Sequence, residues 1–197
     1  VSDTHDGGVN YDIAAAVNMP IVADKAAVRV SAFQSHDGGY IDNVALDRQD
    51  VNRSNIYGGR LDFLVTPTDA LNIRIAGFSQ DISRGGESTA DYGFSGAPLY
   101  GSVDQYRKTA EPFVQHFRLG SLSVADDLDW ATLTSISSYQ TIRTQTVLDL
   151  TVAYGRYCAY EGISCSSVGL TYGMSTDKFV QEVRLASKSS TSVEWLI

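Results

Sequence analysis

Apolar and polar residues alternate along much of the chain. The clearest alternation runs from Tyr11 to Met19, where odd positions are mostly apolar and even positions are polar or small. A period of two is the pattern of a β-strand whose two faces meet different environments. Further strands are expected near 26–33, 56–65, 71–75, 112–124, 130–146, 178–185 and from 193 onward. We therefore predict an antiparallel all-β fold of about eight strands.

The connections between these stretches are alternately short and long. The short connections fall at 18–25, 66–70, 125–129 and 187–192, whereas 36–54, 81–111 and 149–177 are long and rich in Gly, Ser, Asp and Tyr. Pro20 is expected to end the first strand. Transmembrane β-barrels have short periplasmic turns and long outer loops. The connections therefore favour a barrel segment, although a soluble β-sandwich with exposed polar faces remains an alternative.

Charged residues recur at strand positions that we assign to one side of the wall. They are Asp12, Arg29, Arg60, Asp62, Arg74, Arg118, Glu182 and Arg184. A compact soluble core would bury so many charges at a high free energy, whereas a wide barrel can hold them in a polar lumen. In the opening strand we expect the side chains of one parity to face lipid and those of the other to face the lumen. The lipid-facing set is Tyr11, Ile13, Val17 and Met19, and the lumen-facing set is Asn10, Asp12 and Asn18.

Aromatic residues lie near both ends of the expected strands. Trp130 and Trp195 come just after short turns, while Tyr11, Tyr57 and Tyr139 lie nearer the long loops, as Tyr40 does. Outer-membrane barrels carry aromatic girdles at both membrane interfaces. This placement agrees with the barrel interpretation.

Composition narrows the range of functions. The 197 residues are 43% hydrophobic and 19% charged, with a net charge of −8. No apolar run approaches the roughly 20 residues of a transmembrane helix. Nucleic acid is not an expected partner, because phosphate binding needs clustered Lys and Arg. The chain starts without Met or a signal peptide and stops within an expected strand, so we treat residues 1–197 as one partial barrel domain of a larger protein.

Several segments, in order, resemble TonB-dependent outer-membrane receptors. The first barrel hairpin of that family is similar to residues 17–25, 28–33 and 37–43, and its periplasmic turns are similar to 67–71. Residues 135–139, 179–187 and 194–196 are similar to later strands of the same family. The resemblance implies the early part of a 22-stranded barrel in the outer membrane of a Gram-negative bacterium. The chain lacks a recognisable plug domain and TonB box, so coupling to the TonB complex would use a region outside it.

The resemblance implies active uptake of a scarce small-molecule ligand, with an iron-siderophore complex as the family default. Cobalamin and oligosaccharides are other ligands of such receptors. No cofactor is expected and the protein is not expected to be an enzyme, because no nucleophile and base are recognisable and the carboxylates Glu87, Asp91 and Glu111 have no fixed partner. Two alternatives stay open. One is a complete small outer-membrane barrel acting as an anchor or adhesin, and the other is a soluble extracellular β-sandwich that binds or hydrolyses its ligand.

Candidate site residues lie in the long connections. Cys158 and Cys165 are close in sequence within one loop, which predicts a local disulfide formed in an oxidising compartment. This bridge is expected to hold nearby tyrosines as a ligand-facing aromatic surface. The candidate ligand-binding residues are Tyr92, Tyr100, Tyr154, Tyr157 and Tyr160.

A short repeat brackets the first expected hairpin. His5 and Asp6 precede one Gly-Gly pair, and His36 and Asp37 precede another. If the hairpin brings the repeats together, the two His and two Asp are a candidate site for a transition metal. The simpler interpretation is turn chemistry, in which Asp-Gly-Gly lets the chain leave the sheet. No metal site is therefore predicted.

Overall fold

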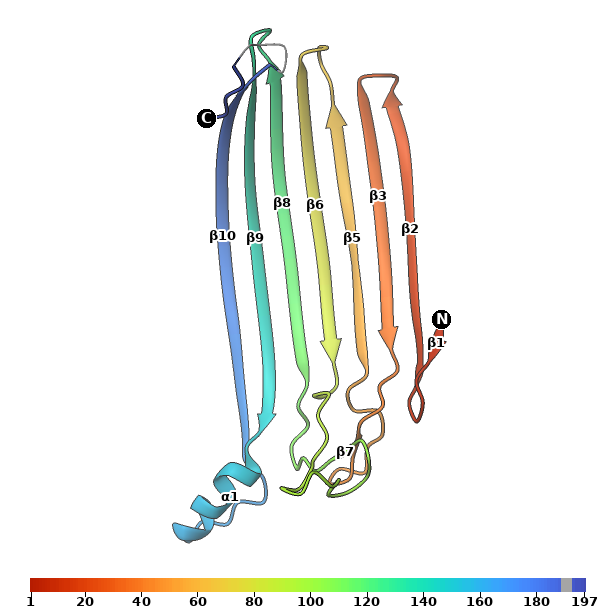
Figure 1. The fold of residues 1–197 in the computed structure, drawn as a ribbon, viewed down its shortest axis with the longest axis vertical. Coiled ribbons are helices and arrows are strands. Elements are labelled where there is room, and N and C mark those ends of the chain that lie inside the picture. The colour runs from red at the N-terminus through yellow and green to blue at the C-terminus, as the bar shows by residue number, and fades with distance from the viewer. Residues whose placement is uncertain (189–192) are drawn as a thin grey trace.

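The fold is one layer of antiparallel sheet (Figure 1). The computed structural model describes residues 1–188 and 193–197, which form an eight-stranded sheet in the order β1-β2-β3-β5-β6-β8-β9-β10. Its strands are β1 (Ser2–Asp3), β2 (Val9–Val22), β3 (Ala26–Asp37), β5 (Ser54–Val65), β6 (Leu71–Arg84), β8 (Phe113–Asp127), β9 (Ala131–Asp149) and β10 (Gly169–Ser187). The connections add a parallel pair, β4 (Asp42–Asn43) and β7 (Asp104–Gln105), and the helix α1 (Thr151–Tyr160). The predicted antiparallel all-β fold is confirmed, and the described strands form an open sheet.

Short and long connections lie at opposite ends of the sheet (Figure 1). The turns 23–25, 66–70 and 128–130 join long strands at one end, which we call the turn end. Asp24 and Asp129 have φ of 57° and 63° in two of these turns. Asp adopts this left-handed conformation more readily than most residues. The long connections gather at the other end, which we call the loop end.

Pro20 lies inside β2 rather than at its end. Pro20 is opposite Ala27 of β3, and the register shifts between Pro20 and Val22. The other side of β2 pairs only with the two residues of β1, so β2 is an edge strand for most of its length. Proline is tolerated in edge strands because its missing N–H removes no ladder bond on the open side. The expectation that Pro20 ends the strand is therefore wrong.

The third long connection is shorter than expected. Residues 151–160 form α1, and β10 already begins at Gly169. β10 pairs with β9 over its full length, from Gly169 opposite Asp149 to Ser187 opposite Ala131. Of the expected final strand, the structure shows only a bridge between Leu196 and Ala186. The expected connection 187–192 falls largely outside the described residues.

The register divides the strand residues between two faces, because directly opposed residues share a face. Seven of the eight charged residues that the sequence assigned to the lumen share one face, which we call the charged face. Arg118 is the exception, because it lies opposite Ser79 and Thr141 on the other face. That second face, which we call the apolar face, carries Ile13 and Val17, whereas Asp12 and Asn18 lie on the charged face.

Aromatic side chains form a diagonal row across the apolar face. Tyr57 lies two residues nearer the turn end than the position opposite Tyr11, since Tyr11, His36 and Asn55 are in one register line. Tyr139 lies four residues nearer again, and Phe179 is opposite Tyr139. From β2 to β10, across six pairs of neighbouring strands, the row thus moves six residues toward the turn end. With standard strand spacings this is about 20 Å over about 29 Å, an angle of about 35°.

The diagonal row separates charged from apolar positions. Asp81, His116, Arg118, Arg143 and Asp177 all lie on its loop-end side. On the turn-end side, the charge that the described residues of this face show is Asp126, beside the 128–130 turn. The band between row and turns is mostly Val, Ile, Leu, Ala and Gly, and three of its polar residues, Ser135, Ser137 and Gln181, bond to one another. Gln181 Nε2, for example, donates to Ser135 Oγ at 3.0 Å.

Neither face of the sheet is packed into a globular core. Among the described residues, the buried hydrophobic side chains are Ile41, Ala131 and Cys158. Ile13 is 63% exposed, Ile75 53% and Val183 60%, and all three lie in the apolar band. Such an extended exposed apolar surface is a site of contact with an apolar partner or medium. No helix in the described part of the chain is long and apolar enough to cross a membrane.

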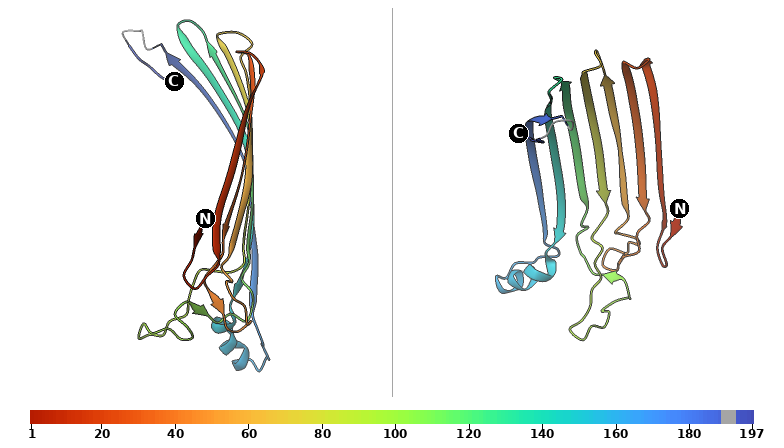
Figure 2. Two further views of the ribbon diagram at one scale, coloured as in Figure 1. Left: turned by 90° about the vertical axis from the view of Figure 1, so that its right-hand side faces the viewer. Right: turned by 45° about the horizontal axis from the view of Figure 1, so that its top comes forward.

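Several charges of the charged face are paired within that face. Asp62 accepts from Arg60 Nε at 2.6 Å and from Arg74 Nε at 2.9 Å. Nearer the loop end of this face, Phe33 and Phe78 stack with their ring centroids 6.5 Å apart, and the Phe78 and Phe117 centroids are 5.8 Å apart. The β3–β5 and β6–β8 connections project from one side of the sheet (Figure 2). This side is the charged face, because Arg84 on that face donates to Glu87 in the loop at 2.9 Å.

Candidate functional site

Buried amides hold the loop-end segments together. Asn43 of β4 donates its side-chain N–H to the Arg107 carbonyl at 3.0 Å, and Asn43 Oδ1 accepts the Arg107 amide at 3.1 Å. Asn52 Oδ1 accepts the amides of Tyr40 and Ile41, both at 2.8 Å. Asn43 and Asn52 are 2% and 6% exposed. Satisfied buried amides of this kind fix backbone geometry, so these loops have a defined conformation.

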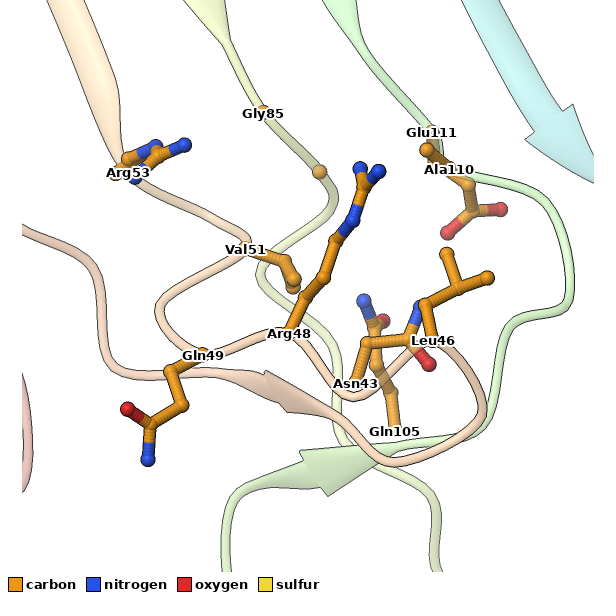
Figure 3. A pocket seen from close by; sticks show the side chains of 11 residues that line it. Asn43, Leu46, Arg48, Gln49, Val51, Arg53, Gly85, Gln105, Ala110 and Glu111 are labelled. Atoms are coloured by element: carbon orange, nitrogen blue, oxygen red, sulfur yellow. The ribbon is translucent and has the colours of Figure 1, made fainter.

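The first cavity lies where the β3–β5 and β6–β8 connections meet (Figure 3). We call it the arginine cavity. It has a volume of about 440 Å³, and its polar lining comes from Asn43, Arg48, Arg53, Gln105 and Glu111. The Arg48 side chain extends along the cavity toward Gly85 and Glu111 (Figure 3). Within residues 1–188 and 193–197, the guanidinium groups of Arg48 and Arg53 have no hydrogen-bond or ion-pair partner.

Glu111 forms one wall of the arginine cavity and is 6% exposed. Its Oε1 accepts the Asp149 amide at 2.8 Å. Its Oε2 is buried without a hydrogen-bond donor in the described residues, although Arg107 Nε lies 3.3 Å away. Arg107 donates instead to both oxygens of Asp91, at 3.0 and 2.9 Å. One carboxylate oxygen therefore retains acceptor capacity in a site shielded from bulk water.

The second cavity lies on the other side of Glu111, between the β6–β8 connection and the start of α1. We call it the tyrosine cavity. It has a volume of about 880 Å³, and its lining includes Tyr92, Tyr100, Tyr106, Arg107 and Asp149. The rings of Tyr100 and Tyr106 stack at 5.4 Å, and the Tyr92 hydroxyl donates to the Ser102 carbonyl at 2.7 Å. The structure thus brings the sequence candidates Tyr92 and Tyr100 together in one cavity and adds Tyr106.

The three tyrosines of α1 lie apart from both cavities. Tyr154, Tyr157 and Tyr160 follow one another at intervals of three, which places them along one side of a helix. They are 51%, 60% and 86% exposed. They form an open aromatic surface, whereas the first turn of α1 contributes Val152 and Ala153 to the tyrosine cavity.

Cys158 and Cys165 are joined by a disulfide. The bridge connects the last turns of α1 to the segment that leads into β10. Cys158 is 8% exposed, whereas its neighbours on the helix are open to solvent. The bridge therefore supplies much of the order of a segment that buries little apolar surface.

We expect Cys158→Ser together with Cys165→Ser to loosen this segment. The small disulfide ring restricts the open loop by about 2–3 kcal/mol in the chain-entropy model. Trypsin cleavage after Arg156, inside α1, should become at least about tenfold faster in the double variant. Ser166→Ala, beside the bridge, serves as the control and should leave cleavage unchanged. An equal cleavage rate in the double variant would show that other contacts order α1.

The two His-Asp-Gly-Gly repeats meet through their glycines. The Gly8 amide donates to the Gly39 carbonyl at 3.0 Å. His36 Nδ1 is instead 2.7 Å from Asn55 Oδ1, and its ring stacks on Tyr11 at 5.1 Å. His5 and Asp6, with side chains 98% and 72% exposed, contact each other across 3.4 Å. Among the described residues, no group of three or more His, Cys, Asp or Glu side chains is placed to hold a metal ion.

Asp149 fastens the start of α1 to the β7–β8 connection. Its Oδ1 accepts the Thr151 amide at 2.7 Å, and its Oδ2 accepts the amides of Thr109, at 3.0 Å, and Lys108. Burial disfavours the charged carboxylate, but the hydroxyl and amide of Thr151 and the other two amides outweigh it. The pKa of Asp149 therefore lies below its ordinary value.

This junction should open in acid. A carboxyl group whose pKa is lowered by folding stabilises the folded state above its unfolded pKa of about 4, and this stabilisation is lost as pH falls through the lower folded pKa. We expect amide exchange at Thr109 and Thr151, corrected for intrinsic rate, to accelerate between pH 5 and pH 3. Asp149→Asn should exchange quickly at both values. A wild-type protein with no pH effect would contradict the assigned role of Asp149.

Comparisons with protein-family models, curated proteins and solved structures found no match for this chain. The functional interpretation therefore depends on the sheet and the loop-end cavities. The sequence identified Tyr92 and Tyr100 but missed Arg48, Arg53 and Gln105. It singled out Glu111 only as a loop carboxylate without a fixed partner.

Proposed function

We propose that this sheet is part of the wall of an outer-membrane β-barrel receptor that takes up a scarce small ligand. The observation that carries the proposal is the diagonal aromatic row. Its angle of about 35° to the register lines matches the 35–45° by which strands tilt in barrels. If the strands are tilted by this angle, Tyr11, Tyr57, Tyr139 and Phe179 come to one height, as an interfacial girdle requires.

The distribution of charge supports the same orientation. The apolar band on the turn-end side of the row is suited to hydrocarbon, and Asp81, His116 and Arg118 lie beyond it at the height of the lipid headgroups. The opposite face holds ion pairs such as Arg60–Asp62, which suit a wet lumen. The lipid partner is thus the outer membrane, with the loop end outside the cell. The edges of β2 and β10 would pair with further strands to close the barrel.

The loop-end cavities support a role in ligand capture. They are concave, have volumes in the range of small-molecule sites, and combine aromatic rings with a few fixed polar groups. The resemblance to TonB-dependent receptors makes an iron-siderophore complex the default ligand. Uptake would be energised by the TonB complex through a region outside this chain.

Growth of a deletion strain tests this proposal. We expect the strain to lose growth on one class of complexed iron or scarce carbon source and to regain it with the full-length wild-type gene. Growth on free ferrous iron and on glucose serves as the control and should be unchanged. Normal growth on every source, with the protein recovered outside the outer-membrane fraction, would exclude the receptor function.

A further inference from the structure

The arginine cavity combines cationic groups with a buried acceptor. Arg48 and Arg53 line it as guanidinium groups without a partner in the described part of the chain. Guanidinium groups bind carboxylates through paired N–H donors, which makes them the usual choice for planar anions. Both residues are exposed and therefore accessible to a ligand, and two cations in one concave site favour an anionic ligand.

Glu111 adds a second requirement to the same cavity. Its Oε2 is buried and accepts no hydrogen bond from a described residue. A buried carboxylate oxygen without a hydrogen-bond donor is costly, so a ligand that donates an O–H or N–H would stabilise the site. Arg107 lies 3.3 Å from Oε2 and offsets part of the negative charge, which reduces its repulsion of an anion.

The floor of the cavity limits the size and flexibility of the ligand. Asn43 and Gln105, which are 2% and 1% exposed, belong to the paired strands β4 and β7. Their positions are fixed by the β4–β7 pairing and by the bonds between Asn43 and Arg107. The volume of about 440 Å³ accommodates a small organic molecule on this rigid floor.

We propose that the arginine cavity binds a small organic anion that carries a carboxylate next to a hydroxyl or amino group. Arg48 and Arg53 bind the carboxylate, and Glu111 Oε2 accepts the neighbouring O–H or N–H. The inference rests on the proposed receptor function and deepens it, because it names the ligand chemistry of the loop end. Binding requires no metal ion.

Two probes that differ by one hydroxyl test the inference. Citrate has three carboxylates and a hydroxyl, and propane-1,2,3-tricarboxylate has the same carboxylates without the hydroxyl. Each is titrated calorimetrically into the full-length protein in iron-free detergent buffer. We expect citrate to bind about tenfold more tightly, because the bond to a charged acceptor is a strong one. Equal affinity for both probes, or binding of neither at millimolar concentration, would overturn the proposal.

Variants assign the effect to residues. Arg48→Gln with Arg53→Gln should weaken both probes by at least tenfold and keep their ratio. Glu111→Gln should reduce the ratio toward one, because the acceptor loses its charge. Arg29→Gln is the control, since Arg29 donates to Asn18 on a strand near the turn end, and it should change neither affinity. Unchanged binding in the double arginine variant would place the anion elsewhere.

The outcome is separable from that of the receptor proposal. Titration in detergent does not depend on transport, and growth does not depend on citrate. Growth loss on a complexed nutrient together with absent citrate binding would refute the ligand chemistry and leave the receptor function in place. Citrate binding without a growth phenotype and without an outer-membrane location would refute the receptor function and leave the ligand chemistry in place.

Discussion

Leu61→Lys is expected to destabilise the membrane-inserted protein by about 2–4 kcal/mol, the cost of a cationic side chain at the midplane of a barrel's lipid face. Leu61 lies in the apolar band, opposite Val30 and Gly77, and is 51% exposed in the isolated sheet. In water such a substitution on an exposed face would change stability by less than about 0.5 kcal/mol. The expected effect therefore comes from lipid rather than from packing.

Ser83→Lys is the matched control for this prediction. Ser83 is on the same face one strand away, opposite Asn55 and Val114 and on the loop-end side of the aromatic row. There the cost of a lysine should fall to about 0–1 kcal/mol, as at a membrane interface. The measurement is reversible urea unfolding of the full-length protein in phospholipid vesicles. Similar effects of the two lysines would argue that the apolar face does not contact hydrocarbon.

Spin labels give an independent check of the same orientation. A label at Ile13 should be reached by oxygen, which dissolves in lipid, and a label at Asp12 by a water-soluble nickel chelate. The two residues are neighbours in β2 and lie on opposite faces of the sheet. Equal accessibility of both sites to both reagents would reject the barrel wall.

The period of two was sufficient to predict most long strands and their faces, because alternation is strong where the faces meet different environments. The first half of β10 was missed although Leu170, Tyr172 and Met174 alternate there with small or polar residues, and these apolar residues lie on the charged face rather than on the apolar face. The period of two also misplaced Arg118. In β8 the aromatic residue Phe117 lies on the charged face, so the residues on either side of it, His116 and Arg118, are on the other face. Hydrophobicity alone does not identify the lumen in this part of the sheet.

The loop-end site was less accessible to sequence reasoning because loops carry no periodic signal. Tyr92 and Tyr100 could be found by composition, since aromatic residues in long loops often bind ligands. Arg48 and Glu111 come together only through the pairing of β4 with β7, which joins segments more than sixty residues apart. No local pattern encodes that contact. The helix α1 was missed for a related reason, since its residues show little amphipathic pattern and Gly155 lies in its middle.

Gly58→Ala should destabilise the sheet by about 1–3 kcal/mol, the range for forcing extra atoms into a packed site. Gly58 lies in the middle of β5 on the charged face, opposite Phe33 and Gln80. A β-carbon at this position would be 2.5 Å from the Ser79 carbonyl oxygen and 2.8 Å from Phe33 Cε1. The backbone oxygen cannot move without straining the β5–β6 ladder. The Phe33 ring, which stacks on Phe78 at 6.5 Å, would have to leave its place above the glycine.

Gly120→Ala provides the control for this effect. Gly120 is also in the middle of a strand, and a β-carbon there would meet no atom within 4 Å. This substitution should leave stability unchanged or raise it by about 0.4–1 kcal/mol, because alanine restricts the unfolded chain. The measurement is the free energy of unfolding of each variant, compared with that of the wild type in the same vesicles. If Gly58→Ala proves as stable as Gly120→Ala, then Phe33 does not pack over Gly58, and the aromatic contacts of the charged face do not help to stabilise the wall.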